Sequence, residues 1–522
     1  MLRLDSAICN EDWINFWSST SCSALLRHQL DHHPLLFSFD FSVVNRVGTF
    51  KFFKTWSLHE DCRKILLENW TTRFRGHGLS RLQAKLRHMK QKFTHWNRMV
   101  FGNVDRQVRL AVDEVNRIQQ IIDMEGFSDE LYAQDIEAQL LLTKALNHQE
   151  ELWREKARDQ RFIHGDRNTS YFHRVSKIRA STNSISMLQD GDRVITNPLD
   201  IEVHVVNYFQ SIFLVANNCV PNNLIEETIP SMVSITENRM LMRVPQRVEI
   251  KDAVFALNGD RAPGPDGFGG HFYQTYWDIV GDDVIESVQD FFITDALPDN
   301  FNNNLIVLVS KVPGPRVMGD YRPIALANFQ FKVITKILAD RLVPITMRII
   351  STEQRGFIRD RNISNCVILA FEAINSLGKK QYGGNVALKV DIAKAFDTLD
   401  WNFLLEVLRK FGFAETFVNW ILVILKSARL SILVNGKAVG YFTCSRGVRQ
   451  GDPLSPLLFC LAEEVLSRAL SMAAASGRLL PIAYCRGVVF PTHILYADDV
   501  MIFCTRTKRN IRTLLNIFQR YS

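Results

Sequence analysis

Two adjacent acidic residues, Asp498 and Asp499, stand between two apolar runs, Ile494–Tyr496 and Val500–Cys504. Short apolar runs on both sides of a turn predict a β-hairpin that carries the two carboxylates at its tip. A solvated loop explains a single aspartate well, but two carboxylates flanked by buried strands repel each other unless a cation neutralises them. Carboxylate oxygens are the ligands that Mg²⁺ prefers. The pair therefore predicts a folded core with strands and a candidate metal site.

The rest of the second half alternates strand-like and helix-like patterns. Apolar runs at Leu305–Ser310 and Val386–Val390 predict strands, and the latter run ends at Asp391. Asn435-Gly436 predicts a hairpin turn between strands at 431–434 and 441–444. Helices are expected at about 398–411, closed by Gly412, at 453–472 and at 508–521.

The first third of the chain has a different pattern. Residues 56–160 repeat apolar positions three and four apart and contain no proline, so they predict a helical hairpin or bundle. Plausible breaks lie at Gly76, Gly78, Gly102 and Gly126. Farther along, Asp190-Gly191 predicts a turn between strands near 185–188 and 193–195, and residues 35–39 form an earlier strand-like run.

Five motifs occur in a fixed order along the chain. Residues 390–397 (VDIAKAFD), 446–456 (RGVRQGDPLSP) and 496–499 (YADD) together resemble motifs A, B and C of reverse transcriptases. Residues 262–268 (APGPDGF) and 321–326 (YRPIAL) resemble the fingers motifs of LINE-type, non-LTR retrotransposons. Residues 165–173 (GDRNTSYFH), and residues 96–103 with Trp96-Asn97 and VFGN, are similar to the linker of plant LINE polyproteins.

The resemblance implies an α+β fold, with a right-hand polymerase palm and fingers preceded by a mainly α-helical basic region. It divides the chain into a C-terminal remnant of an apurinic-type endonuclease domain (1–45), a basic helical linker region (56–180), a connecting segment with short strands (181–244) and the fingers and palm (245–522). On this basis the sequence is expected to be truncated at both ends, without the end of the palm and without the thumb.

The same resemblance assigns roles to matching residues. Asp391, Asp498 and Asp499 would be catalytic ligands of two Mg²⁺ ions, with Mn²⁺ as an alternative. Two such ions activate a 3′-hydroxyl and stabilise a leaving pyrophosphate. Phe396 falls at the position of a steric gate against a 2′-hydroxyl, although the palm core also explains this ring. The nucleotide pocket would further include Gln450, Gly451, Arg322 and Lys311.

Two arginines and one Asp-His pair also stand out, but none of them is assigned a catalytic role. Arg446 and Arg449 either contact the template backbone or are surface charges. Asp31 and His32, in LDHHP, resemble the end of the endonuclease found upstream in these elements. Because nearly all of that domain would lie before residue 1, this pair is interpreted as an inactive relic.

The basic residues are distributed unevenly. The formal net charge of the whole chain is +7, but residues 61–110 hold twelve Lys and Arg and three Asp and Glu, a net of +9. This concentration indicates either a polyanionic partner or a solvated helix face. Four aromatic residues lie among the basic ones: Trp70, Phe93, Trp96 and Trp153. They either pack between helices, which is favoured, or stack on bases.

Several classes of protein are excluded. No apolar run reaches the ~18 residues of a membrane span, and acidic residues interrupt any secretory signal, so a protein of the nucleus or cytoplasm is expected. Nine scattered cysteines without a C-x-x-C pair argue against a disulfide framework. Two functions stay open: an RNA-directed DNA polymerase that uses an RNA template, a DNA primer and dNTPs, or a catalytically silent nucleic-acid-binding remnant of a decayed element. The sequence predicts no oligomeric state.

Overall fold

The computed structural model describes residues 13, 19–24, 35–40, 49–157, 169–214, 222–483 and 490–521. Strands β1 (Ser19–Ala24) and β2 (Leu35–Asp40) pair antiparallel, and Ser19 lies opposite Asp40. The strand expected at 35–39 is therefore confirmed. The predicted endonuclease relic, Asp31 and His32, lies outside the described residues.

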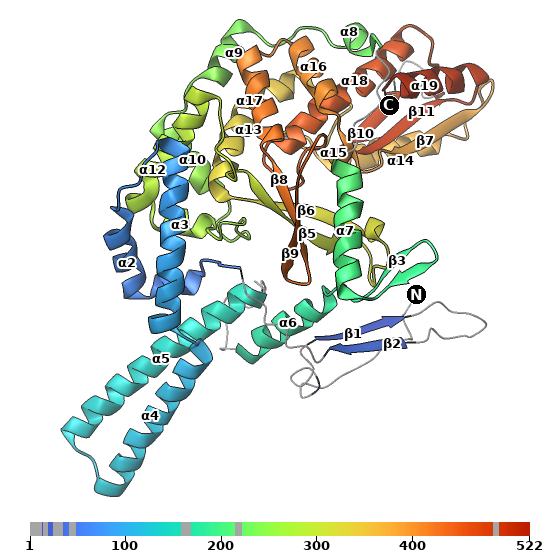
Figure 1. The fold of residues 1–522 in the computed structure, drawn as a ribbon. Helices are drawn as coiled ribbons and strands as arrows, with labels where there is room; N and C mark the ends of the chain where they lie inside the picture. The colour runs from blue at the N-terminus through green and yellow to red at the C-terminus, as the bar shows by residue number, and fades with distance from the viewer. Residues whose placement is uncertain are drawn as a thin grey trace.

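A series of helices follows, as the apolar spacing predicted. These are α2 (Glu60–Trp70), α3 (Gly78–Trp96), the short π-helix η2 (Asn97–Phe101), α4 (Val104–Glu125) and α5 (Asp129–Ala157). Gly78, Gly102 and Gly126 stand at helix ends with positive φ, which confirms the predicted breaks. Helices α4 and α5 form an antiparallel hairpin that projects from the rest of the molecule (Figure 1).

The aromatic residues of this region serve packing. Trp70, Phe93 and Trp96 are at most 4% exposed, and Phe93 and Trp96 pack against Trp56. Trp153 donates its ring N–H to Asp105 at 3.2 Å. The interpretation as helix-packing anchors is therefore confirmed, since buried rings cannot receive a stacked base.

Part of the basic excess is neutralised inside the molecule. Helix α3 packs along α12 (Trp277–Thr294), and Lys85 lies 2.8 Å from the Asp283 carboxylate of α12. Arg81 lies 3.5 Å from Asp283 and also pairs with Glu286. Exposed basic residues without such a role in packing are Arg73, Arg75, Arg87, Lys92 and Arg98. Part of the basic excess is therefore used in helix packing, and the rest stays exposed, either to solvent or to a polyanionic partner.

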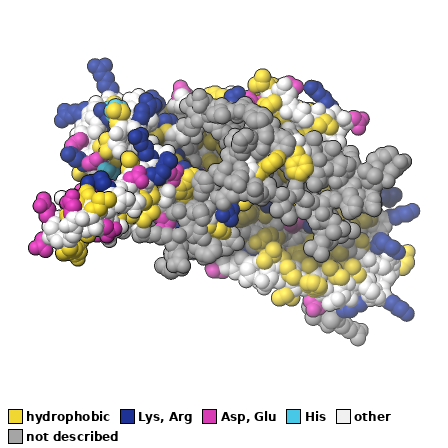
Figure 2. Space-filling view, turned by 90° about the horizontal axis from the view of Figure 1, so that it is seen from below, with side chains coloured by type: hydrophobic (Ala, Val, Ile, Leu, Met, Phe, Trp, Pro, Cys, Tyr) yellow, Lys and Arg dark blue, Asp and Glu magenta, His cyan; other side chains and the backbone are white. Residues whose placement is uncertain are grey.

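The helical hairpin beyond α3 is acidic. Residues 113–137, which form its distal part, hold eight Asp and Glu and one Lys or Arg. In Figure 2 acidic side chains gather at the left-hand end, where Figure 1 places this hairpin, and Lys and Arg gather above them. The predicted basic helical region (56–180) thus has basic helices near the core, which carry the excess noted at 61–110, and an acidic arm.

Two sheets form the centre of the second half. The first has the strand order β6-β5-β8-β9, made of β6 (Tyr321–Ala327), β5 (Asn303–Ser310), β8 (Arg429–Val434) and β9 (Lys437–Thr443). Asn435-Gly436 makes the predicted turn, with both residues at positive φ. Strand β9 begins directly after that turn rather than at Tyr441, because the tight two-residue turn starts the pairing of Val434 with Lys437.

Helix α7 (Pro198–Phe213) covers this sheet, after the small hairpin of β3 (Leu188–Asp190) and β4 (Arg193–Ile195). Asn197 begins α7 by accepting the N–H groups of Leu199 and Asp200. The predicted Asp-Gly hairpin is confirmed, although its first strand begins at Leu188.

The second sheet has the order β10-β11-β7 and consists of β10 (His493–Tyr496), β11 (Asp499–Thr505) and β7 (Asn385–Asp391). All pairs in it are antiparallel. The hairpin predicted around Asp498 and Asp499, and the strand predicted before Asp391, are both confirmed. Figure 1 shows this sheet beside α18 and α19.

Helices surround both sheets. The predicted buried helix is α18 (Ser455–Ala475), and the predicted amphipathic helix is α19 (Lys508–Tyr521). The helix expected at 398–411 is divided into α15 (Ala395–Thr398) and α16 (Trp401–Phe411), because Asp400 caps a new helix through the Phe403 N–H at 2.8 Å. The remaining helices are η1 (Lys54–Leu58), α6 (Thr169–Thr182), α8 (Leu224–Thr228), α9 (Ile235–Met242), α10 (Arg247–Ala256), α11 (Gly270–Thr275), η3 (Met318–Asp320), α13 (Phe329–Ile349), α14 (Ile363–Ser376) and α17 (Glu415–Lys426).

One hydrophobic core connects most of these elements. It runs from Phe52 through α2, α3, α12, α13 and α16 to Ile517 of α19. The predicted linker helices α2 and α3 are therefore built into the same core as the helices around the sheets. None of the helices within the described ranges has both the length and the apolar character needed to span a membrane.

Candidate active site

Three aspartates meet at one end of the second sheet. Asp391, the last residue of β7, lies directly opposite Asp499, the first residue of β11. Tyr496 pairs with Asp499 across the hairpin, so that Ala497 and Asp498 form the turn. Residues opposite each other on antiparallel strands have Cβ atoms about 5 Å apart. The sheet register thus brings together the three carboxylates that the sequence singled out.

A lysine occupies part of this acidic end. Asp391 and Asp499 are exposed and Asp498 is half-buried. The Lys389 ammonium lies 3.0 Å from an Asp499 carboxylate oxygen. The hydrogen bond to Asp499 raises the pKa of Lys389, and the charges of Asp391 and Asp498 raise it further. Lys389 therefore holds a positive charge next to all three carboxylates.

The donor atoms fit a hard divalent cation. Carboxylate oxygens from two paired strand ends and from the turn between strands are the ligand type that Mg²⁺ takes. Within the described ranges, no three His, Cys, Asp or Glu side chains converge closely enough to form a finished metal cage. The sheet register brings the three aspartates to one place, while the Asp499 side chain is paired with Lys389.

Phe396 lies behind the carboxylates on α15. Its ring stacks on Phe459 of α18, with centroids 4.5 Å apart, and meets Phe357 edge-on at 6.1 Å. The ring is half-buried and packs with Ala395 and Ala497. Phe396 thus packs among buried residues, as the core role requires, and the gate role stays a proposal.

Gln450 faces a carboxylate that the sequence analysis did not select. Its side-chain N–H group lies 3.3 Å from both oxygens of Asp397, which is 6% exposed. Burial raises the pKa of Asp397 to about 7, although the hydrogen bond from Gln450 acts in the opposite direction. The only sequence signal for Asp397 was its place at the end of the motif at 390–397.

The loop that carries Gln450 is attached to the first sheet. The Gln450 carbonyl accepts the Ala325 N–H of β6 at 2.9 Å. Gly451 has φ +105°, and a Cβ there would lie 3.1 Å from the Ala325 carbonyl oxygen. Glycine is therefore required at 451 both by its backbone conformation and by the nearby strand.

Lys311 and Arg322 lie on the first sheet rather than on the carboxylate sheet. Arg322 is exposed on β6, opposite Val309. Lys311 follows β5, donates to the Gly319 carbonyl at 2.9 Å, and its positive charge lowers the pKa of Asp397. Lys311 thus lies near Asp397, whose carboxylate contacts Gln450.

The interpretation of Arg449 as a surface charge is wrong, and a template contact stays a prediction. Its guanidinium donates to the Ile424 carbonyl at 2.7 Å and to the Asn302 side chain, and lies over the Phe331 ring at 5.0 Å. Arg446 donates to the Ile212 carbonyl at 2.6 Å. Both arginines tie the loop to helices α7 and α17, because a short loop between packed elements leaves their side chains close to helix carbonyls.

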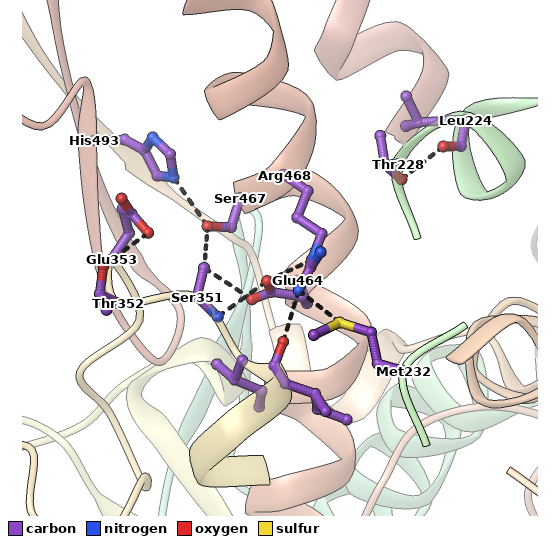
Figure 3. Close-up of polar contacts among 12 residues, drawn as sticks. Leu224, Thr228, Met232, Ser351, Thr352, Glu353, Glu464, Ser467, Arg468 and His493 are labelled. Carbon is purple, nitrogen blue, oxygen red and sulfur yellow. Dashed lines mark hydrogen bonds and ion pairs between the residues drawn. The ribbon is translucent and has the colours of Figure 1, made fainter. Parts of the chain in front are cut away.

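A buried polar network lies behind β10. Figure 3 shows the His493 ring meeting the Ser467 hydroxyl, which meets Ser351, which in turn meets the Glu464 carboxylate. The three contacts measure 2.9, 2.8 and 2.9 Å. Arg468 completes the network with an ion pair to Glu464 at 2.7 Å. This network joins the first residue of β10 to α18.

We expect a substitution of His493 to change how stability depends on pH. Burial lowers the pKa of His493 to about 4, from an ordinary value near 6.5, although Glu353 acts in the opposite direction. Between pH 6.5 and 4, His493 is therefore protonated in the unfolded chain but neutral in the folded chain. Its contribution to stability is present above pH 6.5 and is lost as the pH falls. The loss between pH 7 and pH 5 is about 2 kcal/mol.

Urea unfolding of the protein and of His493→Gln, at pH 7 and pH 5, measures this effect. The difference between the two proteins isolates His493 from the buried acids Asp266 and Asp397, whose raised pKa values act with the opposite sign. Equal pH dependence in both proteins would show that His493 is not held neutral by the fold.

Comparison with known proteins agrees with this geometry. Residues 309–522, which include the carboxylate-bearing strands of the second sheet and the Gln450 loop, match the family described as reverse transcriptase (RNA-dependent DNA polymerase). The uncharacterized 149 kDa protein of transposon TX1 from Xenopus laevis is 24% identical over 421 residues, 80% of this chain and 31% of that protein.

Two further relatives cover shorter stretches. A retrovirus-related Pol polyprotein of the type-1 retrotransposable element R2 from Nasonia vitripennis is 30% identical over 257 residues, 49% of this chain and 23% of that protein. An uncharacterized mitochondrial protein of Arabidopsis thaliana is 47% identical over 70 residues, 13% of this chain and 57% of that protein.

The chain spans less than a third of the length of the TX1 and R2 proteins. Residues 309–522 match a reverse transcriptase domain, and the chain is similar to proteins of non-LTR retrotransposons.

Proposed function

We propose that the chain is an RNA-directed DNA polymerase whose metal-binding carboxylates are Asp391, Asp498 and Asp499. The observation that carries the proposal is the register of the second sheet, which places Asp391 opposite Asp499 with Asp498 in the adjoining turn. Two Mg²⁺ ions, or Mn²⁺, would supply activation of a primer 3′-hydroxyl and charge neutralisation on the departing pyrophosphate. The carboxylates hold such ions, and Lys389 keeps Asp499 paired until they bind.

The pocket for the incoming nucleotide is proposed to lie between the two sheets. Gln450 and Gly451 form its floor, where the glycine backbone permits close approach. Lys311 and the exposed Arg322 would contact phosphate oxygens, for which a guanidinium offers two parallel donors. The buried Asp397 fixes the Gln450 side chain from behind through both of its oxygens.

The partners proposed are an RNA template, a DNA primer and dNTPs. Exposed basic residues of α3 and its flanking loops, Arg73, Arg75, Arg87 and Lys92, offer charge for a phosphate backbone. We also propose that the element comes from a plant, which the Arabidopsis relative supports, and that it acts in the nucleus or cytoplasm, which no relative supports. The division of the chain into residues 1–45, 56–180, 181–244 and 245–522 also stays a prediction.

Primer extension tests the function. A DNA primer annealed to RNA is incubated with the protein, Mg²⁺ and dNTPs, and the product is sized on a gel. Extension complementary to the RNA is the expected result. Salt-sensitive RNA binding without extension at any protein concentration would favour a catalytically silent nucleic-acid-binding protein instead.

We expect Phe396→Val to weaken discrimination between dNTPs and rNTPs. The ring edge that is not covered by Phe459 and Phe357 would meet a 2′-hydroxyl, and removing this steric contact typically changes a specificity ratio by roughly tenfold or more. The ratio of kcat/KM for dCTP and rCTP measures it. Phe413→Val, a change in the core away from this site, is the control and should leave the ratio unchanged.

A further inference from the structure

A segment outside the five motifs runs beside the strand that leads into the aspartate turn. Residues 351–356 lie parallel to β10, with Gln354 bridged to Leu495. The Leu495 N–H donates to the Glu353 carbonyl, and the Arg355 N–H donates to the Leu495 carbonyl, both at 2.9 Å. This segment therefore acts as a short extra strand on the free edge of β10.

The side chain of Gln354 reaches from this segment into the turn. Its carbonyl oxygen accepts the Ala497 N–H at 3.1 Å and the Gly356 N–H at 2.9 Å. The side chain is 1% exposed, and its N–H group is buried without a hydrogen-bond partner in the described part of the chain. Burying a donor without a partner lowers the stability of the fold. The two hydrogen bonds that the Gln354 oxygen accepts must therefore compensate for this loss.

The turn needs an external support. Ala497 has φ +56°, a left-handed conformation that a residue with a Cβ adopts only at a cost of the order of a kilocalorie per mole. Gly356 lies so close that a Cβ there would be 2.5 Å from the Ala497 nitrogen. The hydrogen bond from Ala497 to Gln354 and the close approach at Gly356 together hold the residue directly before Asp498.

The other end of the segment is fixed to a rigid helix. Ser351 donates its N–H and its hydroxyl to the Glu464 carboxylate of α18 at 3.0 and 2.9 Å. Through Ser467 the same network reaches His493 at the start of β10 (Figure 3). The start of β10 is thus attached to α18 directly, through His493 and Ser467, and its end is attached through residues 351–356, from Ala497 to Gln354 and from Ser351 to Glu464.

We propose that Gln354 is a positioning residue that sets the aspartate turn for metal binding. It does not touch substrate or metal; it acts by holding the Ala497 N–H, and so fixes the direction in which the Asp498 carboxylate leaves the turn. The inference rests on the proposed function, in which Asp498 is a metal ligand. Without the support, the turn samples other conformations and the metal-binding arrangement is populated only part of the time.

Metal binding measured without substrate tests the role. Mn²⁺ is added to the full chain, and the free ion is quantified by electron paramagnetic resonance. Gln354→Met keeps the shape but removes the acceptor, and Gly356→Ala pushes on Ala497 from the other side. The control is Gln330→Met, because Gln330 is equally buried and also loses two side-chain hydrogen bonds, one to Tyr273 and one to Asp266.

The expected result is a roughly tenfold weaker Mn²⁺ affinity for Gln354→Met and Gly356→Ala, with Gln330→Met unchanged. In primer extension, the Mg²⁺ concentration for half-maximal rate should rise by a similar factor while the KM for dNTP stays constant. Equal Mn²⁺ affinity in the wild type and Gln354→Met would overturn the inference. If the wild type nevertheless extended primers, the polymerase proposal would still hold. If the Mn²⁺ affinity shifted as expected but no primer were extended, only the polymerase proposal would be refuted.

Discussion

Asp498→Asn is expected to reduce RNA-templated primer extension at least a thousandfold. Asp498 lies in the turn between β10 and β11, beside the paired residues Asp391 and Asp499. An amide removes one negative charge from the group that must neutralise a divalent cation, and it is a far weaker ligand for a hard ion than a carboxylate. Two-metal catalysis depends on that ligand for both reacting oxygens, so the loss falls on kcat.

Single-nucleotide addition by the wild type and by Asp498→Asn measures this effect. Asp252→Asn is the matched control, because Asp252 is exposed on α10 and the substitution changes the same atoms. The control should extend primers at the wild-type rate. Extension by Asp498→Asn within tenfold of the control would contradict the assignment of Asp498 as a metal ligand.

Gly447→Ala is expected to have the second largest effect, at least a hundredfold on extension and about 3 kcal/mol on the free energy of unfolding. Gly447 has φ +84°, and a Cβ would lie 2.4 Å from the Asp397 carbonyl oxygen. The Gly447 N–H donates to Leu399 at 2.7 Å, and its carbonyl accepts from the Trp401 ring at 2.8 Å. The substitution therefore separates the Gln450 loop from the helix that follows Asp391.

Gly477→Ala separates the two causes of that effect. Gly477 also has positive φ, +67°, but a Cβ there meets nothing within 4 Å. It should lose only about 1 kcal/mol of stability and keep its activity. Urea unfolding and primer extension on both variants make the comparison. If Gly447→Ala behaved like Gly477→Ala, the close packing of the loop on Asp397 would not matter for the reaction.

Elements that are specified by neighbouring residues could be predicted from the sequence. The apolar runs around Asp498 and Asp499 place β10 and β11 within a residue of their observed ends. The amphipathic repeat of α19 fixes that helix at Lys508–Tyr521. In both cases one side of a short segment is buried. The spacing of apolar residues within that segment is therefore sufficient to predict its structure.

Pairings between distant segments were not predictable in the same way. Strand β5 pairs parallel with β8, which lies about 120 residues later, and nothing in either run selects that partner. The basic stretch of α3 could not be connected to its acidic neighbour, because Asp283 and Glu286 lie on α12, some 200 residues away. Charge along the sequence shows an excess but not what neutralises it.

The same limit applies to the site. The sequence identified Asp391, Asp498 and Asp499, which are local to strand ends, and the structure brings them together. It did not identify Gln354, because a single glutamine in a loop carries no pattern until the loop is placed beside β10. The internal contacts of Arg449 could not be predicted for a related reason: its partners, Asn302 and Ile424, come from distant elements.

Metal-dependent nucleotide addition shows whether the three aspartates bind catalytic metal ions. The protein is stripped with EDTA, mixed with a DNA primer on an RNA template and one dNTP, and Mg²⁺ is titrated back while the primer is followed at single-nucleotide resolution. The account predicts no addition without metal, saturable recovery with Mg²⁺ for the dNTP that the RNA specifies, and no recovery for Asp391→Asn at any Mg²⁺ concentration. Addition in the absence of Mg²⁺, or equal recovery by Asp391→Asn, would contradict it.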